Sequence, residues 1–461
     1  MSNQYIVGQA RDDASDDIIP PMTAINATKP STRNWWAFFL DYVFFGIGLT
    51  FANQNTVLPA FAATLTDSKV LIGSVSAIWL GAWLLPQLFA ANFLSSKPKK
   101  YPYMVWGSVI GRPAFWLLPL LLVWGGLARW PLLLLAIFLI GLAWFAATDA
   151  FVAIAWFDLF GKAMGSAERG KLIGLGQVVN GVGAIGAGWL VSYLLSASGP
   201  AYPLNYAAVF GLGGLSFFIS FIGIAFTVEI PEATPPHQPA ASLRDHWHRF
   251  SDVWRNDPGF VRANLVRLLT GLSMLATPFY ILHATQQAGI SSEAIGAFAA
   301  TAPIGSMLAG IVLGRIVTAH GSHRVMQVVA WLAIIPPFLG LGLTFIRATA
   351  AHTWVYVVCY LIIGMVEGSS MLGFFNYILD LAPPGRRPIY MGLANTLGSL
   401  LVIPPILGGW ILDHSTYSIL FTLTLAGVAA AAVVALGLQK VQHKHDADIE
   451  LMPLATDGQR M

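Results

Sequence analysis

The segment PLLLLAIFLIGLAWFAATDAFVAIAWF, residues 131–157, decides the fold class of this chain. It holds one charged side chain, Asp149, in an otherwise uncharged run. A helix needs roughly 20 residues to cross about 30 Å of hydrocarbon. The length and composition of this segment therefore predict a membrane-spanning helix.

Segments of the same kind recur along the chain and predict twelve spans in all. The others lie at 35–62, 70–94, 103–126, 172–196, 204–228, 263–287, 294–317, 325–346, 353–379, 388–412 and 418–438. We therefore expect an all-α integral membrane protein of twelve transmembrane helices.

The composition excludes a water-soluble protein. Hydrophobic residues make up 56% of the 461 positions and charged residues 10%, against roughly a quarter charged in soluble domains. The formal charge of +3 comes without a basic stripe, so no nucleic-acid partner is expected. A lone cysteine, Cys359, gives no disulfide framework or thiolate metal site.

The basic residues alternate between the loops, and this alternation predicts the orientation. Loops after odd-numbered spans hold Lys69, Arg129 and Arg347. Loops after even-numbered spans hold many more: Lys97, Lys99, Lys100, Lys162, Arg169, Lys171, Arg244, Arg249, Arg255, Arg262, Arg315, Arg324, Arg386 and Arg387. By the positive-inside rule both termini are predicted to be cytoplasmic.

The longest connection divides the chain into two groups of six spans. We expect a disordered cytoplasmic tail at 1–33, a first bundle at 34–228, a linker at 229–262, a second bundle at 263–438 and a second tail at 439–461. Within the linker, Leu243, Trp247, Phe250 and Trp254 recur at helical spacing among arginines. This pattern predicts an amphipathic helix on the cytoplasmic membrane surface.

The loop GRIVTAHGSHR, residues 314–324, resembles the cytoplasmic loop signature of the major facilitator superfamily, with Thr318 in place of its acidic residue. The resemblance, extended by the six-plus-six division, implies two six-helix bundles around a central site. These bundles would rock to expose the site alternately to each side of the membrane. It also implies that spans one, four, seven and ten line the cavity.

The same resemblance implies a cytoplasmic gate. Asp158 with Arg169, and Asp380 with Arg386, occupy positions at which the family forms bridges that latch one conformation. The signature loop adds Arg315, Gly321 and Arg324 to this gate. Simple topology-setting charges are the alternative interpretation.

Ionisable side chains within the spans are candidates for the transport path, because such groups are expensive in hydrocarbon. They are Asp41, Arg112, Asp149, Arg267, His283 and Glu367. The functional hypothesis is that Glu367 and Asp149 bind a proton or a cationic part of the substrate, and Asp41 is a further candidate for the path. The alternative is a buried ion pair in which Arg112 neutralises Asp41 or Asp149. Arg267 and His283 lie near predicted span ends and are expected to snorkel.

Amides within the spans are weaker candidates. Asn53, Gln54 and Asn55 form a polar run before Pro59 in the first predicted span. They would either line an aqueous cavity or satisfy the backbone of a proline-bent helix. Further amides of this kind are Asn180, Asn376 and Asn395.

The sequence therefore favours a secondary transporter of a small organic solute, either proton-coupled or facilitative. The alternative is a non-transporting protein of the same fold that binds a lipid or pigment or assists assembly of another complex. No catalytic motif, metal ligand set or cofactor motif was recognised, so we expect no enzyme. The expected partners are the solute, the lipid bilayer and protons, for a monomer in a bacterial inner membrane.

Overall fold

The computed structural model describes residues 32–95, 97–123, 126–229, 253–346, 351–383 and 387–440. Every regular element in these ranges is helical. The first half holds α1 (Thr32–Phe51), α2 (Val57–Ala62), α3 (Lys69–Ser95), α4 (Tyr101–Gly111), α5 (Ala114–Val123), the short 3-10 helix η1 (Leu127–Arg129), α6 (Pro131–Ala163), α7 (Ser166–Leu194) and α8 (Leu204–Phe226).

The second half is more interrupted. It holds α10 (Pro258–Gly271), η2 (Leu272–Leu275), η3 (Thr277–Phe279), α11 (Tyr280–Leu282), the π-helix η4 (His283–Gln287), α12 (Ala294–His320), α13 (Ser322–Leu332), α14 (Ile335–Leu343), α15 (Ala351–Gly368), the π-helix η5 (Met371–Phe375), α16 (Asn376–Leu381), α17 (Arg387–Gly398), η6 (Ser399–Val402), α18 (Ile403–His414) and α19 (Tyr417–Ala435).

Eleven helical segments among the described residues are long and apolar enough to cross a membrane. They coincide, within a few residues at most ends, with eleven of the twelve predicted spans. The all-α membrane class is therefore confirmed. The first predicted span is not among the eleven, so the count of twelve stays a prediction.

The first predicted span is broken where its amides lie. Helix α1 ends at Phe51 and α2 begins at Val57. In the break, the backbone N–H of Asn55 donates to Oδ1 of Asn53 at 2.9 Å, and the N–H of Leu58 donates to the Asn53 carbonyl at 3.0 Å. Asn53 thus satisfies backbone groups that hydrocarbon could not satisfy.

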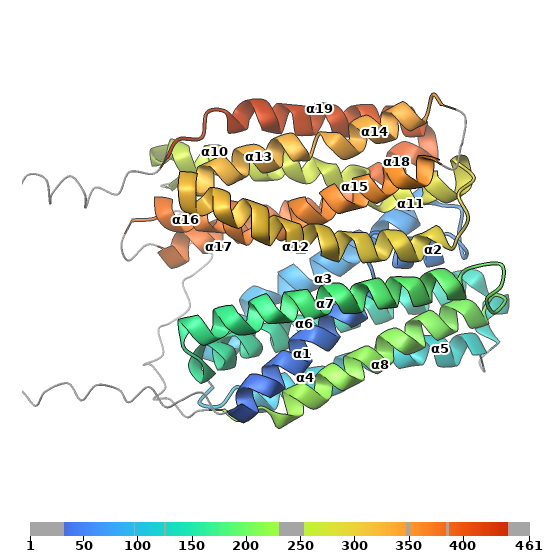
Figure 1. The fold of residues 1–461 in the computed structure, drawn as a ribbon, viewed down its shortest axis with the longest axis horizontal. Helices are drawn as coiled ribbons and strands as arrows, with labels where there is room; N and C mark the ends of the chain where they lie inside the picture. The colour runs from blue at the N-terminus through green and yellow to red at the C-terminus, as the bar shows by residue number, and fades with distance from the viewer. Residues whose placement is uncertain are drawn as a thin grey trace, which may run out of the picture.

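The two halves of the chain form two groups of helices that lie side by side (Figure 1). Helix α7 of the first half packs against α12 of the second, and α3 packs against α18. The start of α1 and the end of α19 lie at the same end of the molecule (Figure 1), which we call the terminal end. The other end is called the distal end. That the terminal end faces the cytoplasm stays a prediction, as do the predicted domain boundaries.

Part of the predicted organisation lies outside the described residues. This applies to most of the first tail, to the C-terminal tail beyond Lys440 and to linker residues 230–252, which include most of the predicted amphipathic helix. The last part of the linker is described. Val253 is buried there in one apolar cluster with Phe260 and Tyr377, so this part of the linker packs on the second half.

Candidate functional site

A cavity of about 700 Å³ lies between the two halves. The first half contributes Leu80, Trp83, Leu84 and Gln87 from α3 and Phe157 from α6. The rest of its described lining comes from the second half, chiefly from α10, α15, η5 and α17. Among the described residues that line it, the charged ones are Arg267 and Glu367.

Glu367 lies in the penultimate position of α15 and is exposed to the cavity. Its Oε1 accepts a hydrogen bond of 2.9 Å from Nδ2 of Asn55. The Asn55 carbonyl in turn accepts from the hydroxyl of Tyr360 on α15 at 3.3 Å. The break between α1 and α2 is thus held against α15 at the cavity wall.

Arg267 lies deeper in the protein than the sequence suggested. Helix α10 begins at Pro258, where the N–H of Phe260 donates to Oδ1 of Asp257 at 2.9 Å. Arg267 is nine residues further on, about 13 Å along the helix. Its expected position near a span end, where it could snorkel, is therefore corrected: it lines the cavity.

The Arg267 guanidinium is held by aromatic rings and one carbonyl. It lies 4.4 Å from the ring centre of Phe374 and 5.2 Å from that of Phe375. Its Nη1 donates to the carbonyl of Ala394 at 2.9 Å. Within the described ranges it forms no ion pair with an acidic side chain.

Asp149 is connected to the cavity through a tryptophan. Nε1 of Trp83 donates to Oδ2 of Asp149 at 3.3 Å. The Trp83 side chain lines the cavity, whereas Asp149 itself is not among the described lining residues. A solute that displaced the indole would therefore change the environment of this carboxylate.

Asp41 lies in a buried polar cluster inside the first half. Its Oδ1 lies 3.4 Å from Nη2 of Arg112 and accepts a short hydrogen bond from the hydroxyl of Ser220. Nη1 of Arg112 donates to Ser220 Oγ at 2.9 Å and to the Phe217 carbonyl at 2.8 Å. Asp41 is 5% exposed and Arg112 is 7% exposed, so the geometry favours the structural interpretation over a role in the path.

The other predicted amides differ in their access to the cavity. Asn395 lines the cavity. The Gln54 carbonyl accepts from Ser76 Oγ at 2.7 Å, and Asn376 Nδ2 donates to the Leu372 carbonyl at 3.4 Å. A Cβ built on Gly46 would lie 1.9 Å from Nδ2 of Asn180, so Asn180 packs closely on α1. Of these amides, Asn395 is the one with direct access to a bound solute.

The first predicted gate pair is not formed in this conformation. Asp158 forms ion pairs with Lys100 at 2.6 Å and Lys162 at 2.7 Å, while Arg169 donates to the Gly161 carbonyl at 3.0 Å. The predicted partner of Asp380, Arg386, lies outside the described residues.

The rest of the predicted gate lies around the α12–α13 turn. Oδ2 of Asp380 accepts from Ser322 Oγ at 3.0 Å. Gly321 has a φ of +86°, a conformation that glycine adopts readily. Arg315 is exposed, and Arg324 donates to Gln327 Oε1 at 2.8 Å. The gating role of these residues stays a prediction.

The two halves contact each other closely toward the distal end. A Cβ built on Gly188 of α7 would lie 2.5 Å from the carbonyl oxygen of Gly296 on α12. At a second contact between the halves, Asp413 of α18 accepts from the N–H of Lys69 at 2.8 Å and the N–H of Val70 at 3.1 Å. A carboxylate from the second half thus caps the first turn of α3, where the helix dipole favours negative charge.

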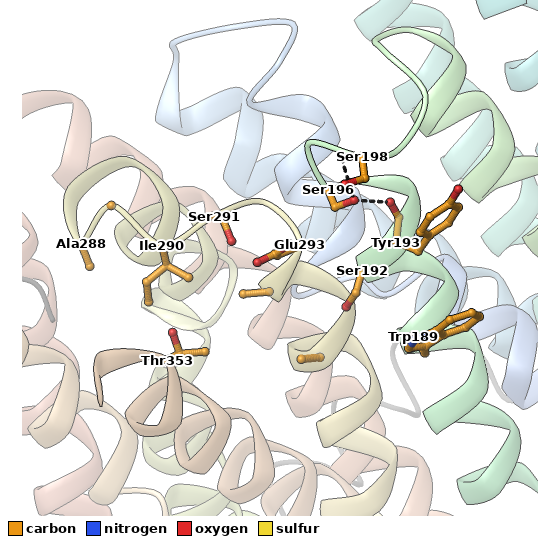
Figure 2. Close-up of a pocket in the computed structure, with 13 residues that line it drawn as sticks. Trp189, Ser192, Tyr193, Ser196, Ser198, Ala288, Ile290, Ser291, Glu293 and Thr353 are labelled. Carbon is orange, nitrogen blue, oxygen red and sulfur yellow. Dashed lines mark hydrogen bonds between the residues drawn. The ribbon is translucent and has the colours of Figure 1, made fainter. Parts of the chain in front are cut away.

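A second hollow, an open groove of about 950 Å³, lies at the mouth of this distal contact. Figure 2 shows Trp189, Ser192 and Tyr193 on one wall and Ser291 and Glu293 on the other. The hydroxyl group of one further wall residue is engaged locally: Ser196 Oγ donates to the Tyr193 carbonyl at 2.8 Å and accepts from the N–H of Ser198 at 3.3 Å. This groove lies beside the contact between α7 and α12.

Several of the cavity residues carry no distinctive signal in the sequence. Gln87, Phe374 and Phe375 do not stand out, because uncharged side chains of these kinds are frequent throughout the spans. Arg267 stands out in the sequence as an intramembrane charge, but a span predicted to begin at 263 puts it near the span end, whereas α10 begins at Pro258. The Asp257–Pro258 pair, a typical helix start, was the signal that could have located it.

Comparisons with known proteins agree with this architecture. The family model of the Major Facilitator Superfamily matches residues 40–403 and 264–454. Over 112 residues the chain is 33% identical to an uncharacterized MFS-type transporter of Schizosaccharomyces pombe. The match covers 23% of this chain and 18% of the length of that relative.

Solved structures share the fold at low sequence identity. A bacterial homologue of the iron transporter ferroportin, in an inward-facing state, superimposes with a TM-score of 0.66 at 14% identity over 88% of this chain and 98% of that chain. A POT family transporter in complex with 5-aminolevulinic acid gives 0.64 at 11% identity over 88% and 97%. The nucleoside transporter NupG gives 0.59 at 16% identity over 88% and 97%.

The match to the family model assigns this chain to a family of membrane transporters rather than of enzymes. The family model covers well over half of the chain, and the helical segments are those of a multi-pass membrane protein. The chain therefore belongs to the major facilitator superfamily of membrane transporters.

Proposed function

We propose that this transporter is a secondary carrier that moves a small organic solute through the cavity by alternating access. The observation that carries the proposal is the cavity itself, which both halves line and which holds one acidic and one basic side chain among its described residues. A site shared between two halves changes its accessibility when the halves rock against each other.

The described conformation fits one step of such a cycle. The halves are in close contact toward the distal end, through Gly188 and Gly296 and through Asp413 and Lys69. The Asp158–Arg169 pair predicted to latch the terminal end is not formed. We infer that the cavity is accessible from the terminal end, which is the predicted cytoplasmic side.

Glu367 is the proposed coupling residue. Its carboxylate reaches the cavity and is joined to Asn55 on the opposite half. Uptake of a proton removes the negative charge from the cavity and weakens the charge-assisted part of this hydrogen bond, which is stronger than a neutral one. Proton binding at Glu367 can thus bias the balance between conformations of the two halves. We further propose that the carrier acts as a monomer in a bacterial inner membrane.

The test is transport by purified protein in proteoliposomes. A solute library is first screened by thermal shift, and solutes that stabilise the protein are then tested in counterflow and under an imposed pH gradient. Wild-type protein should exchange solute in counterflow and accumulate it under the gradient. Glu367→Gln should retain counterflow but lose the accumulation.

The matched control is Glu293→Gln, which removes an exposed acidic side chain from the groove beside the distal contact. This variant should accumulate solute like the wild type. Lack of counterflow for every stabilising solute would overturn the carrier proposal. Accumulation by Glu367→Gln that follows the pH gradient as in the wild type would remove Glu367 from the coupling mechanism.

A further inference from the structure

Arg267 is the basic side chain among the described cavity residues, and no described acidic side chain pairs with it. Within the described ranges its guanidinium forms no ion pair, and one donor, Nη1, is bound to the Ala394 carbonyl. An arginine side chain carries five N–H donors and stays protonated in proteins. A permanent positive charge with donors to spare therefore lines the cavity.

The surrounding residues fix the guanidinium in place. Phe374 and Phe375 lie against it at 4.4 Å and 5.2 Å from the ring centres, which is cation–π distance. A Cβ built on Gly398, one turn after Ala394 on α17, would lie 2.7 Å from Nη2. The absence of a side chain at position 398 thus leaves room for the planar group beside the helix. A positioned guanidinium recognises a carboxylate well because its paired N–H groups match two oxygen atoms.

The remaining walls are apolar and adaptable. Trp83 and Phe157 line the side that the first half contributes, and Met274, Met371 and Met391 line the side of the second half. Methionine side chains repack around varied shapes and make favourable contacts with aromatic rings. Such walls suit an apolar or aromatic body larger than the charged group.

Glu367 does not neutralise this charge directly, since its Oε1 accepts from Asn55 and it forms no ion pair within the described ranges. Protonation of Glu367 would remove the like charge that an anion meets in the cavity. A proton and an anion are therefore compatible occupants of one site.

From this arrangement we propose that the carried solute is an amphipathic organic anion, whose carboxylate binds Arg267 and whose apolar body packs against the aromatic and methionine walls. The inference rests on the proposed carrier function, of which it names the substrate class.

Equilibrium binding tests the proposal without requiring transport. The probes are 4-phenylbutyrate, 4-phenylbutanol and 4-phenylbutylamine, which share one apolar body and differ in the head group. Their affinity is measured on the purified full chain in detergent, by thermal shift and by quenching of tryptophan fluorescence. Wild-type protein should bind the carboxylate at least about tenfold more tightly than the alcohol or the amine, because hydrogen bonds between charged groups contribute about 1.5–3 kcal/mol.

Variants of α10 test whether Arg267 is the source of the carboxylate preference. Arg267→Gln should lose the preference for the carboxylate while its affinity for the alcohol changes less than about twofold. Arg267→Lys should keep part of the preference, since it retains the charge but not the paired donors. Arg262→Gln is the matched control, because Arg262 lies on the same helix but is exposed and donates to the Gly437 carbonyl at 2.6 Å.

Two results would overturn the substrate class: a wild-type protein without carboxylate preference, or an unchanged preference in Arg267→Gln. These outcomes are separate from failure of the proposed function. A protein that binds the carboxylate through Arg267 but shows no counterflow would refute transport and leave the anion site intact. Counterflow of other solutes by a protein that shows no carboxylate preference would support transport and refute the anion site.

Discussion

Asn55 and Glu367 lie 312 positions apart in the chain and are joined by a hydrogen bond of 2.9 Å from Nδ2 of Asn55 to Oε1 of Glu367. The bond connects the break between α1 and α2 to the cavity wall formed by α15. It is therefore both a contact between the two halves and a contact to the proposed proton site.

Asn55→Ala should weaken the closed distal end. A hydrogen bond to a charged group contributes about 1.5–3 kcal/mol, so the population of the described conformation should fall by about tenfold or more relative to its alternative. Spin labels at Ser198→Cys and Ser291→Cys, placed on opposite sides of the groove in a Cys359→Ala background, report this change as longer distances.

Asn376→Ala is the control for this variant. Asn376 donates to Leu372 within its own half, so its loss should leave the distance distribution unchanged. Equal distributions for Asn55→Ala and the unsubstituted protein would show that the Asn55–Glu367 bond does not hold the halves together.

Asp413→Asn should also favour opening of the distal end. The substitution removes the charge that caps α3 through the N–H groups of Lys69 and Val70. A charge near a helix terminus contributes typically about 0.3–1 kcal/mol, so a shift of about two- to fivefold is expected in the same distance measurement. Asp67→Asn, which neutralises an exposed acid of the same loop, should have no effect, and an equal shift in both variants would argue against a specific cap.

Asp41→Ala should destabilise the first half strongly. It leaves Arg112 buried without its acidic partner, which typically costs about 3–5 kcal/mol. The double substitution Asp41→Leu with Arg112→Met should regain much of this loss, because it removes both charges. Thermal unfolding in detergent measures both effects, and a stable Asp41→Ala protein with impaired transport would place Asp41 in the solute path instead.

Gly188→Ala should obstruct the distal contact. Its Cβ would lie 2.5 Å from the Gly296 carbonyl oxygen and 2.6 Å from Cβ of Ala300, so α7 and α12 would have to separate. Gly186→Ala is matched in chemistry and helix, but its Cβ has no described atom of another element within 4 Å. We expect counterflow to fall with Gly188→Ala and to persist with Gly186→Ala, and equal activity of the two would show that this contact is not part of the cycle.

Much of the fold could be predicted because lipid imposes a simple rule. A span must be long and apolar, and segments such as 131–157 satisfy that rule without reference to the rest of the chain. The break in the first predicted span was harder to predict. A run of amides before Pro59 fits both a polar cavity lining and a helix interruption, and the interruption shows only in the local hydrogen bonds of Asn53.

The site could be predicted less fully because it depends on distances between halves. Hydropathy located Glu367 and Arg267 within spans, and the structure places both on one cavity. Nothing in the local sequence distinguished Asp41, which lies beside Arg112 and Ser220, from the two cavity charges. The partners of a buried charge come from other helices, and their register is set by packing that no short segment encodes.

The second half contributes most of the described cavity lining, so selectivity for the solute should depend mainly on that half. Of the described lining residues, those outside α3 and Phe157 all belong to the second half. Chemical discrimination is then concentrated in one part of the gene, while the other part chiefly supplies a moving wall. A chimera that joins this second half to the first half of a relative should keep the solute preference of the donor of the second half.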